Sequence, residues 1–151
     1  SRVDAVACAV GKGSGLALLS RYKGSNLGKH SLAVNHGQGG TWVPVESLDA
    51  LLDRLGLAQA PLAAIKVDVE GYEPLVMQGA PGALARARAL LVELSPALSR
   101  AGGLDVAQAL DDIAAAGFVP DIWDQPGAVP DFAGLRAFTG QATVGFLKPG
   151  A

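Results

Sequence analysis

Apolar and ionisable residues alternate in the middle of the chain, and this segment carries the clearest structural signal. The alternation runs from Ile65 to Glu70. A period of two predicts a strand, over Ala63 to Val69, with apolar side chains on one side and ionisable side chains on the other. Gly71 ends the strand, and Pro74 suits the first turn of a helix. The pattern therefore predicts ionisable groups at the junction of a strand and a helix.

Other short apolar runs predict further strands. They are Val3 to Val10, Leu16 to Ser20, Ser31 to Val34, Thr41 to Val45, Ala89 to Leu94, Phe118 to Trp123 and Ala142 to Lys148. The first is expected to be mostly buried, and the next three have Gly-, Asn-, His- and Gln-rich linkers typical of a hairpin insertion. Gly11 to Gly15 lacks the spacing of a nucleotide-binding loop and predicts a turn between strands. The last two runs flank a Pro/Gly-rich loop, Gln125 to Gly134, and are expected to pair antiparallel.

Helices are predicted between these strands. Ser47 is a candidate N-cap, and leucines follow with helical spacing up to Gly56. Shorter helices are predicted over Pro74 to Gln78 and Pro81 to Arg88. A capping-box pattern at Asp105 starts another helix, which ends at Gly117 and has an apolar face. That face comprises Val106, Ala109, Leu110 and Ile113. The alternation of strands and helices predicts an α/β fold.

Composition limits the classes of function. The chain has 151 residues, half of them hydrophobic, which suits one domain with a real core. Its net charge is −2 and its Lys and Arg residues are scattered, so we expect no nucleic-acid partner. Cys8 is the single cysteine, and we expect it to be a small core residue rather than a nucleophile. Since no apolar run has the length of a membrane span or resembles a signal peptide, we expect no membrane span and a cytoplasmic location.

The segment from Lys66 to Glu73 resembles a known family. Its sequence, Lys-Val-Asp-Val-Glu-Gly-Tyr-Glu, precedes the pair Gly79-Ala80 and a strand ending Leu91-Val92-Glu93-Leu94. This arrangement is similar to the core signature of the FkbM family of S-adenosylmethionine-dependent methyltransferases. Upstream, Asn26 to Leu32 is similar to the family's Asn-x-Gly-x-x-Ser-Leu segment. Val45 to Asp49 resembles its Val-x-Thr-Leu-Asp element, with Ser in place of Thr. The four pieces follow the family's order.

The resemblance covers roughly Val3 to Leu94 and implies a fold. That fold is the back half of a class I (Rossmann-like) methyltransferase sheet, with flanking helices, a hairpin insertion and a terminal antiparallel strand pair. The family's opening strand with its Gly-Ala-Asn-x-Gly turn, and its second strand ending in Glu-Pro, do not occur in the sequence. We therefore interpret residues 1–151 as a single FkbM-like domain truncated at its N-terminus. Missing strands would leave an open sheet edge, through which we expect homo-oligomers to form.

The resemblance to this family also implies an activity, the O-methylation of a hydroxyl on a sugar, lipid or secondary metabolite. S-adenosylmethionine is the implied cofactor, and the residues that bind it are unknown. A hydroxyl acceptor needs a group that positions it and removes its proton. We expect Asp68 to lie nearest the reaction, and Glu70 and Glu73 to bind or deprotonate the acceptor. Repulsion among these carboxylates is expected to raise the pKa of at least one. The expected acceptor-binding residues are Lys66, His30 and Asn26.

These residues also have purely structural interpretations. Glu73 precedes Pro74, where a carboxylate favours a helix start, and Lys66 either pairs with an acid or faces solvent. His30 is a loop histidine, and most such residues are ordinary surface residues. Glu93 is expected to reach the same crevice if its strand neighbours that of Lys66. The resulting carboxylate cluster suits magnesium, but its spacing matches no standard metal loop, so we predict no metal.

Two other functions are compatible with the sequence. The chain is alternatively a non-catalytic fragment or binding domain, in which the carboxylates bind a metal ion or a partner. A metal-dependent barrel hydrolase is the third interpretation. The hairpin insertion and the final strand pair fit poorly with the repeated strand-helix units of a barrel.

Overall fold

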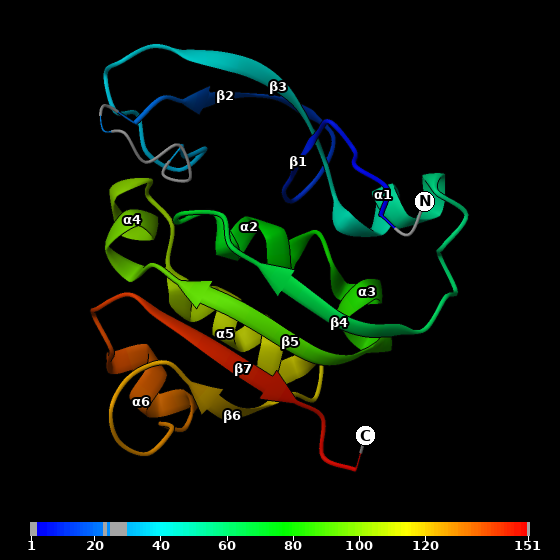
Figure 1. Ribbon diagram of the computed structural model, residues 1–151, viewed down its shortest axis with the longest axis vertical. Helices are drawn as coiled ribbons and strands as arrows, with labels where there is room; N and C mark the ends of the chain where they lie inside the picture. The colour runs from blue at the N-terminus through cyan, green and yellow to red at the C-terminus, as the bar shows by residue number, and fades with distance from the viewer. Residues whose placement is uncertain (1–2, 23, 25–29, 151) are drawn as a thin grey trace.

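The structure, a computed structural model, describes residues 3–22, 24 and 30–150. Within these residues it is an α/β arrangement of two mixed β-sheets and six helices (Figure 1). We call the sheet with strand order β1-β3-β2 the N-terminal sheet and the sheet with order β4-β5-β7-β6 the C-terminal sheet. Both sheets are mixed because each contains a parallel and an antiparallel pair. The predicted α/β class is therefore confirmed.

The N-terminal sheet contains the expected hairpin. Its strands are β1 (Ala9–Val10), β2 (Gly15–Ser20) and β3 (Gly40–Glu46). β3 pairs with β2 in antiparallel fashion and with β1 in parallel. The residues between β1 and β2 form the predicted turn.

Two strand predictions in this region were largely wrong. Residues 3–7 are exposed and outside any strand, because an apolar run forms a strand only where a partner strand accepts its hydrogen bonds. Ser31 makes one antiparallel bridge, with Ser20, and the chain then turns. The Ser31 hydroxyl accepts hydrogen bonds from the backbone N–H groups of Ala33 and Val34, which bends the backbone away from an extended strand.

The C-terminal sheet carries the predicted terminal strand pair. Its strands are β4 (Leu62–Val67), β5 (Ala87–Leu94), β6 (Val119–Trp123) and β7 (Ala142–Leu147). β4 and β5 run parallel, and β7 lies between β5 and β6, antiparallel to both. This open, mixed sheet contradicts the barrel-hydrolase interpretation, which requires parallel strands in a closed ring.

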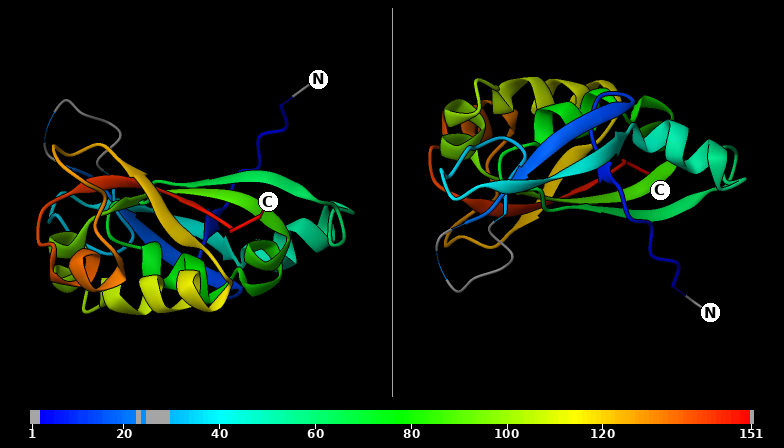
Figure 2. Two further views of the ribbon diagram at one scale, coloured as in Figure 1. Left: turned by 90° about the horizontal axis from the view of Figure 1, so that it is seen from below. Right: turned by 90° about the horizontal axis from the view of Figure 1, so that it is seen from above.

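The helices lie mainly on one side of the C-terminal sheet (Figure 2). Their bounds are α1 (Leu48–Arg54), α2 (Glu73–Gln78), α3 (Pro81–Arg86), α4 (Pro96–Ala101), α5 (Val106–Ala115) and α6 (Phe132–Ala137). Ser47 caps α1 as predicted, by accepting a hydrogen bond from the N–H of Ala50 at 3.2 Å. Helices α4 and α6, with six residues each, were not predicted from the spacing of apolar residues.

The main core lies between the helices and the C-terminal sheet. The predicted apolar face of α5 is fully or almost fully buried there, against alternate residues of β5 and β7 such as Leu90, Val92 and Val144. Burial of each leucine-sized side chain contributes about 1.5–3 kcal/mol to stability. On the opposite face of this sheet, Ile122 and Leu147 remain 58% and 42% exposed.

Strand β4 lies at an edge of the C-terminal sheet, where we expect copies of the chain to associate. Homo-oligomerisation along this edge stays a prediction. Across the described ranges, every helix is too short or too polar to cross a lipid bilayer.

Candidate active site

The turn that joins β4 to α2 carries most of the expected site residues. β4 ends at Val67, two residues earlier than predicted, and the chain then turns through Glu70 and Gly71, whose φ angles are +49° and +98°. A left-handed conformation at a residue other than glycine costs about 1 kcal/mol or more and needs support from its surroundings. Ser31 supplies such support, because its hydroxyl donates a hydrogen bond to the Glu70 carbonyl oxygen at 2.8 Å. The turn is therefore fixed by a residue 39 positions upstream.

Gly71 lets the turn pack directly on α4. A Cβ atom at this position would lie 2.7 Å from the Cβ of Leu98 and 2.8 Å from its carbonyl carbon. These distances are too short for any side chain, and the positive φ angle adds strain for an L-residue. Glycine is therefore required here for two separate reasons.

Glu73 lies beneath this turn and has no exposed surface. Its carboxylate accepts hydrogen bonds from the Gly71 N–H at 2.8 Å and from the Ser99 hydroxyl at 3.1 Å. Burial raises its pKa, against the opposing effect of these bonds. We expected Glu73 to bind or deprotonate the acceptor. Because both oxygens are bonded inside the protein, it instead ties the turn to α4.

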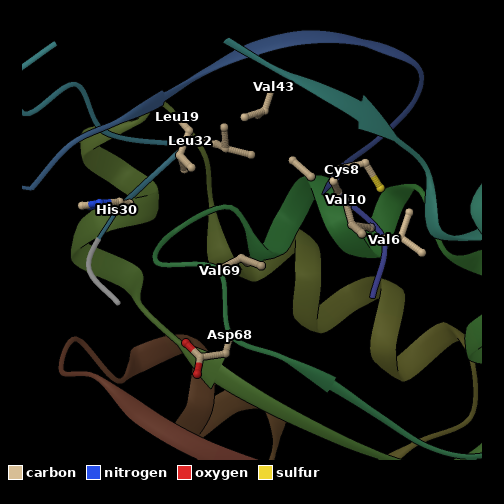
Figure 3. A pocket seen from close by; sticks show the side chains of 11 residues that line it. Val6, Cys8, Val10, Leu19, His30, Leu32, Val43, Asp68 and Val69 are labelled. Carbon is tan, nitrogen blue, oxygen red and sulfur yellow. The ribbon is translucent and has the colours of Figure 1, made fainter. Parts of the chain in front are cut away.

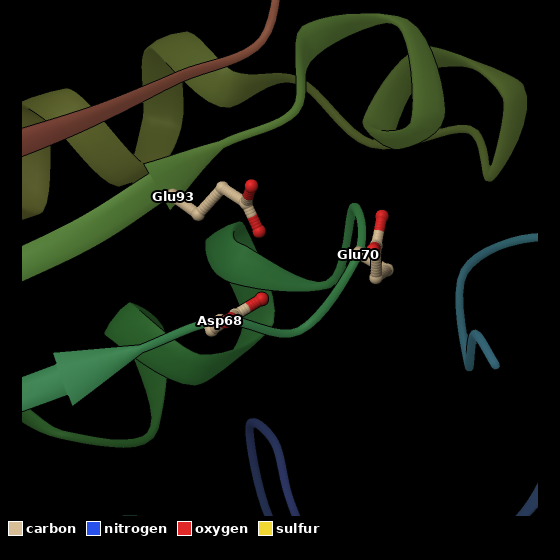
Figure 4. Close-up of side chains that lie close together, drawn as sticks. All are labelled: Asp68, Glu70 and Glu93. Carbon is tan, nitrogen blue, oxygen red and sulfur yellow. The ribbon is translucent and has the colours of Figure 1, made fainter. Parts of the chain in front are cut away.

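Three carboxylates meet at the C-terminal ends of β4 and β5 (Figure 4). Asp68, Glu70 and Glu93 each offer an oxygen atom within 4.8 Å of the others. Glu93 comes from β5, the parallel neighbour of β4, so the prediction that it reaches the same crevice is confirmed. The Lys66 ammonium group donates a hydrogen bond to Asp68 Oδ2 at 2.7 Å, which is the expected pairing.

The carboxyl groups of Asp68 and Glu93 lie close enough to shift each other's pKa, and we call them the proton-sharing pair. Their hydrogen bond is the main cause that raises the pKa of Glu93 to about 7, and partial burial and the charges of Asp68 and Glu70 act in the same direction. The same hydrogen bond lowers the pKa of Asp68, with a further contribution from Lys66. One acid of the pair thus stays ionised while the other titrates close to physiological pH, as a group that transfers protons requires.

A cavity of about 540 Å³ opens between this strand end and the N-terminal sheet (Figure 3). Asp68 lies at one edge, and His30 also lines the cavity. The Nδ1 atom of His30 accepts a hydrogen bond from the N–H of Tyr22 at 3.2 Å. The other lining residues are apolar, apart from Cys8. The structure therefore brings His30 and Asp68 to one cavity, while Asn26 lies outside the described residues.

The remaining motif residues have structural roles. The Asp49 carboxylate accepts hydrogen bonds from the N–H groups of Gly82 and Ala83, both at 2.7 Å, and so caps the start of α3. Ser31 was not among the expected site residues, although it belongs to the Asn-x-Gly-x-x-Ser-Leu segment that could have indicated it. The apolar lining was also missed, because its residues come from separate segments of the chain.

Comparison of the chain with protein-family models, with curated proteins and with solved structures found no match. The relationship to the FkbM family therefore remains a proposal.

Replacement of Glu93 by glutamine tests the shared proton. A folded-state pKa raised from 4.5 to about 7 means that the folded protein binds more protons than the unfolded chain between these values. The free energy of unfolding should therefore fall as the pH rises through this interval. In Glu93→Gln this fall should shrink by about 1 kcal/mol, a value reduced for solvent screening of a partly exposed group. Urea unfolding at pH 4.5 and 8 measures it, and parallel pH profiles for the two proteins would contradict the shared proton.

Proposed function

We propose that this chain carries the acceptor site of an S-adenosylmethionine-dependent O-methyltransferase. The observation that carries the proposal is the position of Asp68, which belongs both to the proton-sharing pair and to the cavity lining. Asp68 also follows the C-terminal end of a strand, the usual place for reactive groups in α/β folds. The FkbM resemblance supports the same reaction, with a hydroxyl of a small molecule or glycan as the acceptor.

The chemistry assigned to the chain is positioning and proton removal. A hydroxyl beside Asp68 would donate its hydrogen bond to the ionised carboxylate, which directs an oxygen lone pair away from the acid. A methylated hydroxyl would have to lose its proton, and this carboxylate pair would accept it. Glu93 is suited to hold the proton in the end, because its pKa is about 7. The hydrogen bond with Glu93, and then the one that Lys66 donates, lower the pKa of Asp68 and so favour its ionised form.

The described residues do not fit the whole cofactor. S-adenosylmethionine carries a carboxylate, and the Gly71 N–H near the start of α2, which could bind such a group, is already bonded to Glu73. Asp68, Glu70 and Glu93 form an acidic cluster at the same strand end, which would repel that carboxylate. The positive sulfonium is compatible with these acids, but we assign no residue to the cofactor and derive no step through it.

A metal-binding or partner-binding domain is the alternative function. The closeness of Asp68, Glu70 and Glu93 favours it. Against it, Lys66 already occupies Asp68 Oδ2, and a cation would have to displace both this ammonium group and the proton of Glu93. The closeness of three carboxylates is not sufficient evidence for a metal site, so methyl transfer remains the proposal. The absence of a nucleic-acid partner and the cytoplasmic location stay predictions.

Calorimetric titration tests the proposed function. S-adenosylmethionine is titrated into this chain and into any longer polypeptide that its gene encodes. Because the described residues do not fit the whole cofactor, we expect binding heat only with the longer polypeptide. Failure of every such polypeptide to bind would remove the methyltransferase proposal. Titration of magnesium chloride in the same instrument tests the alternative.

A further inference from the structure

We propose that the cavity beside Asp68 binds the apolar body of the acceptor, so that the substrate is an apolar alcohol rather than a sugar. This inference rests on the proposed function for the identity of the ligand as an acceptor. The binding of apolar alcohols in the cavity is measurable without any methyl transfer.

The lining of the cavity is the first argument. Apolar side chains reach it from the segment before β1, from β2, from β3 and from the β4–α2 turn (Figure 3). They include Val6, Val10, Leu19, Leu32, Val43 and Val69. A volume of about 540 Å³ is in the range of small-molecule sites. An apolar part of a ligand that binds there would be transferred out of water, and no polar group of the ligand would be buried with it.

The scarcity of polar side chains is the second argument. Among the described residues, Asp68 and His30 are the only strongly polar side chains that line the cavity. A sugar would bring several hydroxyl groups into this space, and each needs a hydrogen-bond partner to compensate for lost water. One hydroxyl at Asp68, with at most a second polar group near His30, matches the lining. An aliphatic or isoprenoid alcohol has this distribution of polar atoms.

Asp68 also fixes the direction in which such a ligand would enter. It belongs to the carboxylate cluster and lies at the edge of the cavity, whereas the apolar residues line the rest of the cavity (Figure 3). An alcohol bound with its chain among the valines and leucines would therefore present its hydroxyl to the proton-sharing pair. The opposite orientation would bury the hydroxyl among apolar side chains.

Cys8 makes this inference testable. It is the single cysteine of the chain, it lines the cavity and it is partly exposed. The rate of its alkylation by iodoacetamide is measured with 1-decanol, with farnesol or with methyl glucoside. At a concentration about tenfold above its Kd, an apolar alcohol should slow alkylation about tenfold, because only the unbound protein reacts. Methyl glucoside should leave the rate unchanged. Equal rates in the presence and absence of both alcohols would overturn the inference, and so would equal protection by the glucoside.

Matched substitutions in the N-terminal sheet complete the test. Val43→Asp places a carboxylate in the lining and should abolish protection by decanol, while Leu16→Asp, at a residue that is 71% exposed and outside the cavity, should retain it. Val43→Phe fills the space without adding charge and should also weaken protection. This second variant shows whether protection is lost because the cavity is blocked, even if the aspartate variant misfolds. Protection that survives both Val43 variants would overturn the inference. The proposed function fails separately, by an absence of S-adenosylmethionine binding, and cavity binding would survive that result.

Discussion

Replacement of Glu73 by alanine should lower the free energy of unfolding by about 3 kcal/mol. The carboxylate is fully buried and accepts hydrogen bonds from the Gly71 N–H and the Ser99 hydroxyl. Alanine would leave both donors without a partner in a space that water does not readily enter, and it would also create a cavity. Urea denaturation followed by circular dichroism measures the loss.

Two further substitutions separate the parts of this effect. Glu73→Gln keeps the shape and one oxygen acceptor, so it should cost only about 1 kcal/mol. Ser99→Ala removes one donor and leaves the bond to Gly71, and should cost a similar amount. If Glu73→Ala were as stable as the wild-type protein, the assignment of Glu73 as the tie between the turn and α4 would be incorrect.

The same residue shows where prediction from sequence reaches its limit. A carboxylate before Pro74 is compatible with a reactive group, a helix-start residue or a buried tie, and the local sequence is identical in all three cases. The choice is made by α4, which brings Ser99 against the turn from 26 positions away. Because helix α4 itself was not predicted, the contact between its Ser99 and Glu73 could not be predicted either.

Elements with a full period of apolar residues were predictable. Helix α5 has its buried face where the spacing places it, and β4 and β5 start and end within two residues of the expected bounds. Local propensity and tertiary packing agree in these segments. The apolar run at residues 3–7 lacked this agreement: its composition favours a strand, but within the described residues no strand pairs with it.

The carboxylate pair was predictable in part. The sequence placed Asp68 at the end of a strand and Glu93 at the end of the next, and parallel pairing then brings the two ends together. Which carboxyl takes the raised pKa depends on the distances to Lys66 and Glu70, which a strand pattern does not supply. The cavity was not predictable, since its walls come from separate parts of the chain.

Replacement of Asp68 by asparagine should reduce methyl transfer by about 10²- to 10⁴-fold, the range expected for loss of a group that accepts a proton. The assay uses an apolar alcohol and the polypeptide that binds S-adenosylmethionine in the calorimetric titration. Asparagine keeps the size of aspartate and can still hydrogen bond a hydroxyl, so protection of Cys8 by decanol should persist. Asp53→Asn, at an exposed position on α1, is the matched control and should retain full activity.

The pH profile distinguishes proton transfer from simple positioning. If the Asp68–Glu93 pair accepts the hydroxyl proton, the wild-type rate should rise with pH up to the pKa of Glu93, about 7, and then level off. Below that pH the pair already holds its proton and accepts a second one only at Asp68, whose pKa is lowered. Glu93→Gln removes the group that titrates near 7 and should flatten this rise. An unchanged profile in Glu93→Gln, together with a normal rate in Asp68→Asn, would show that the two acids only shape the site.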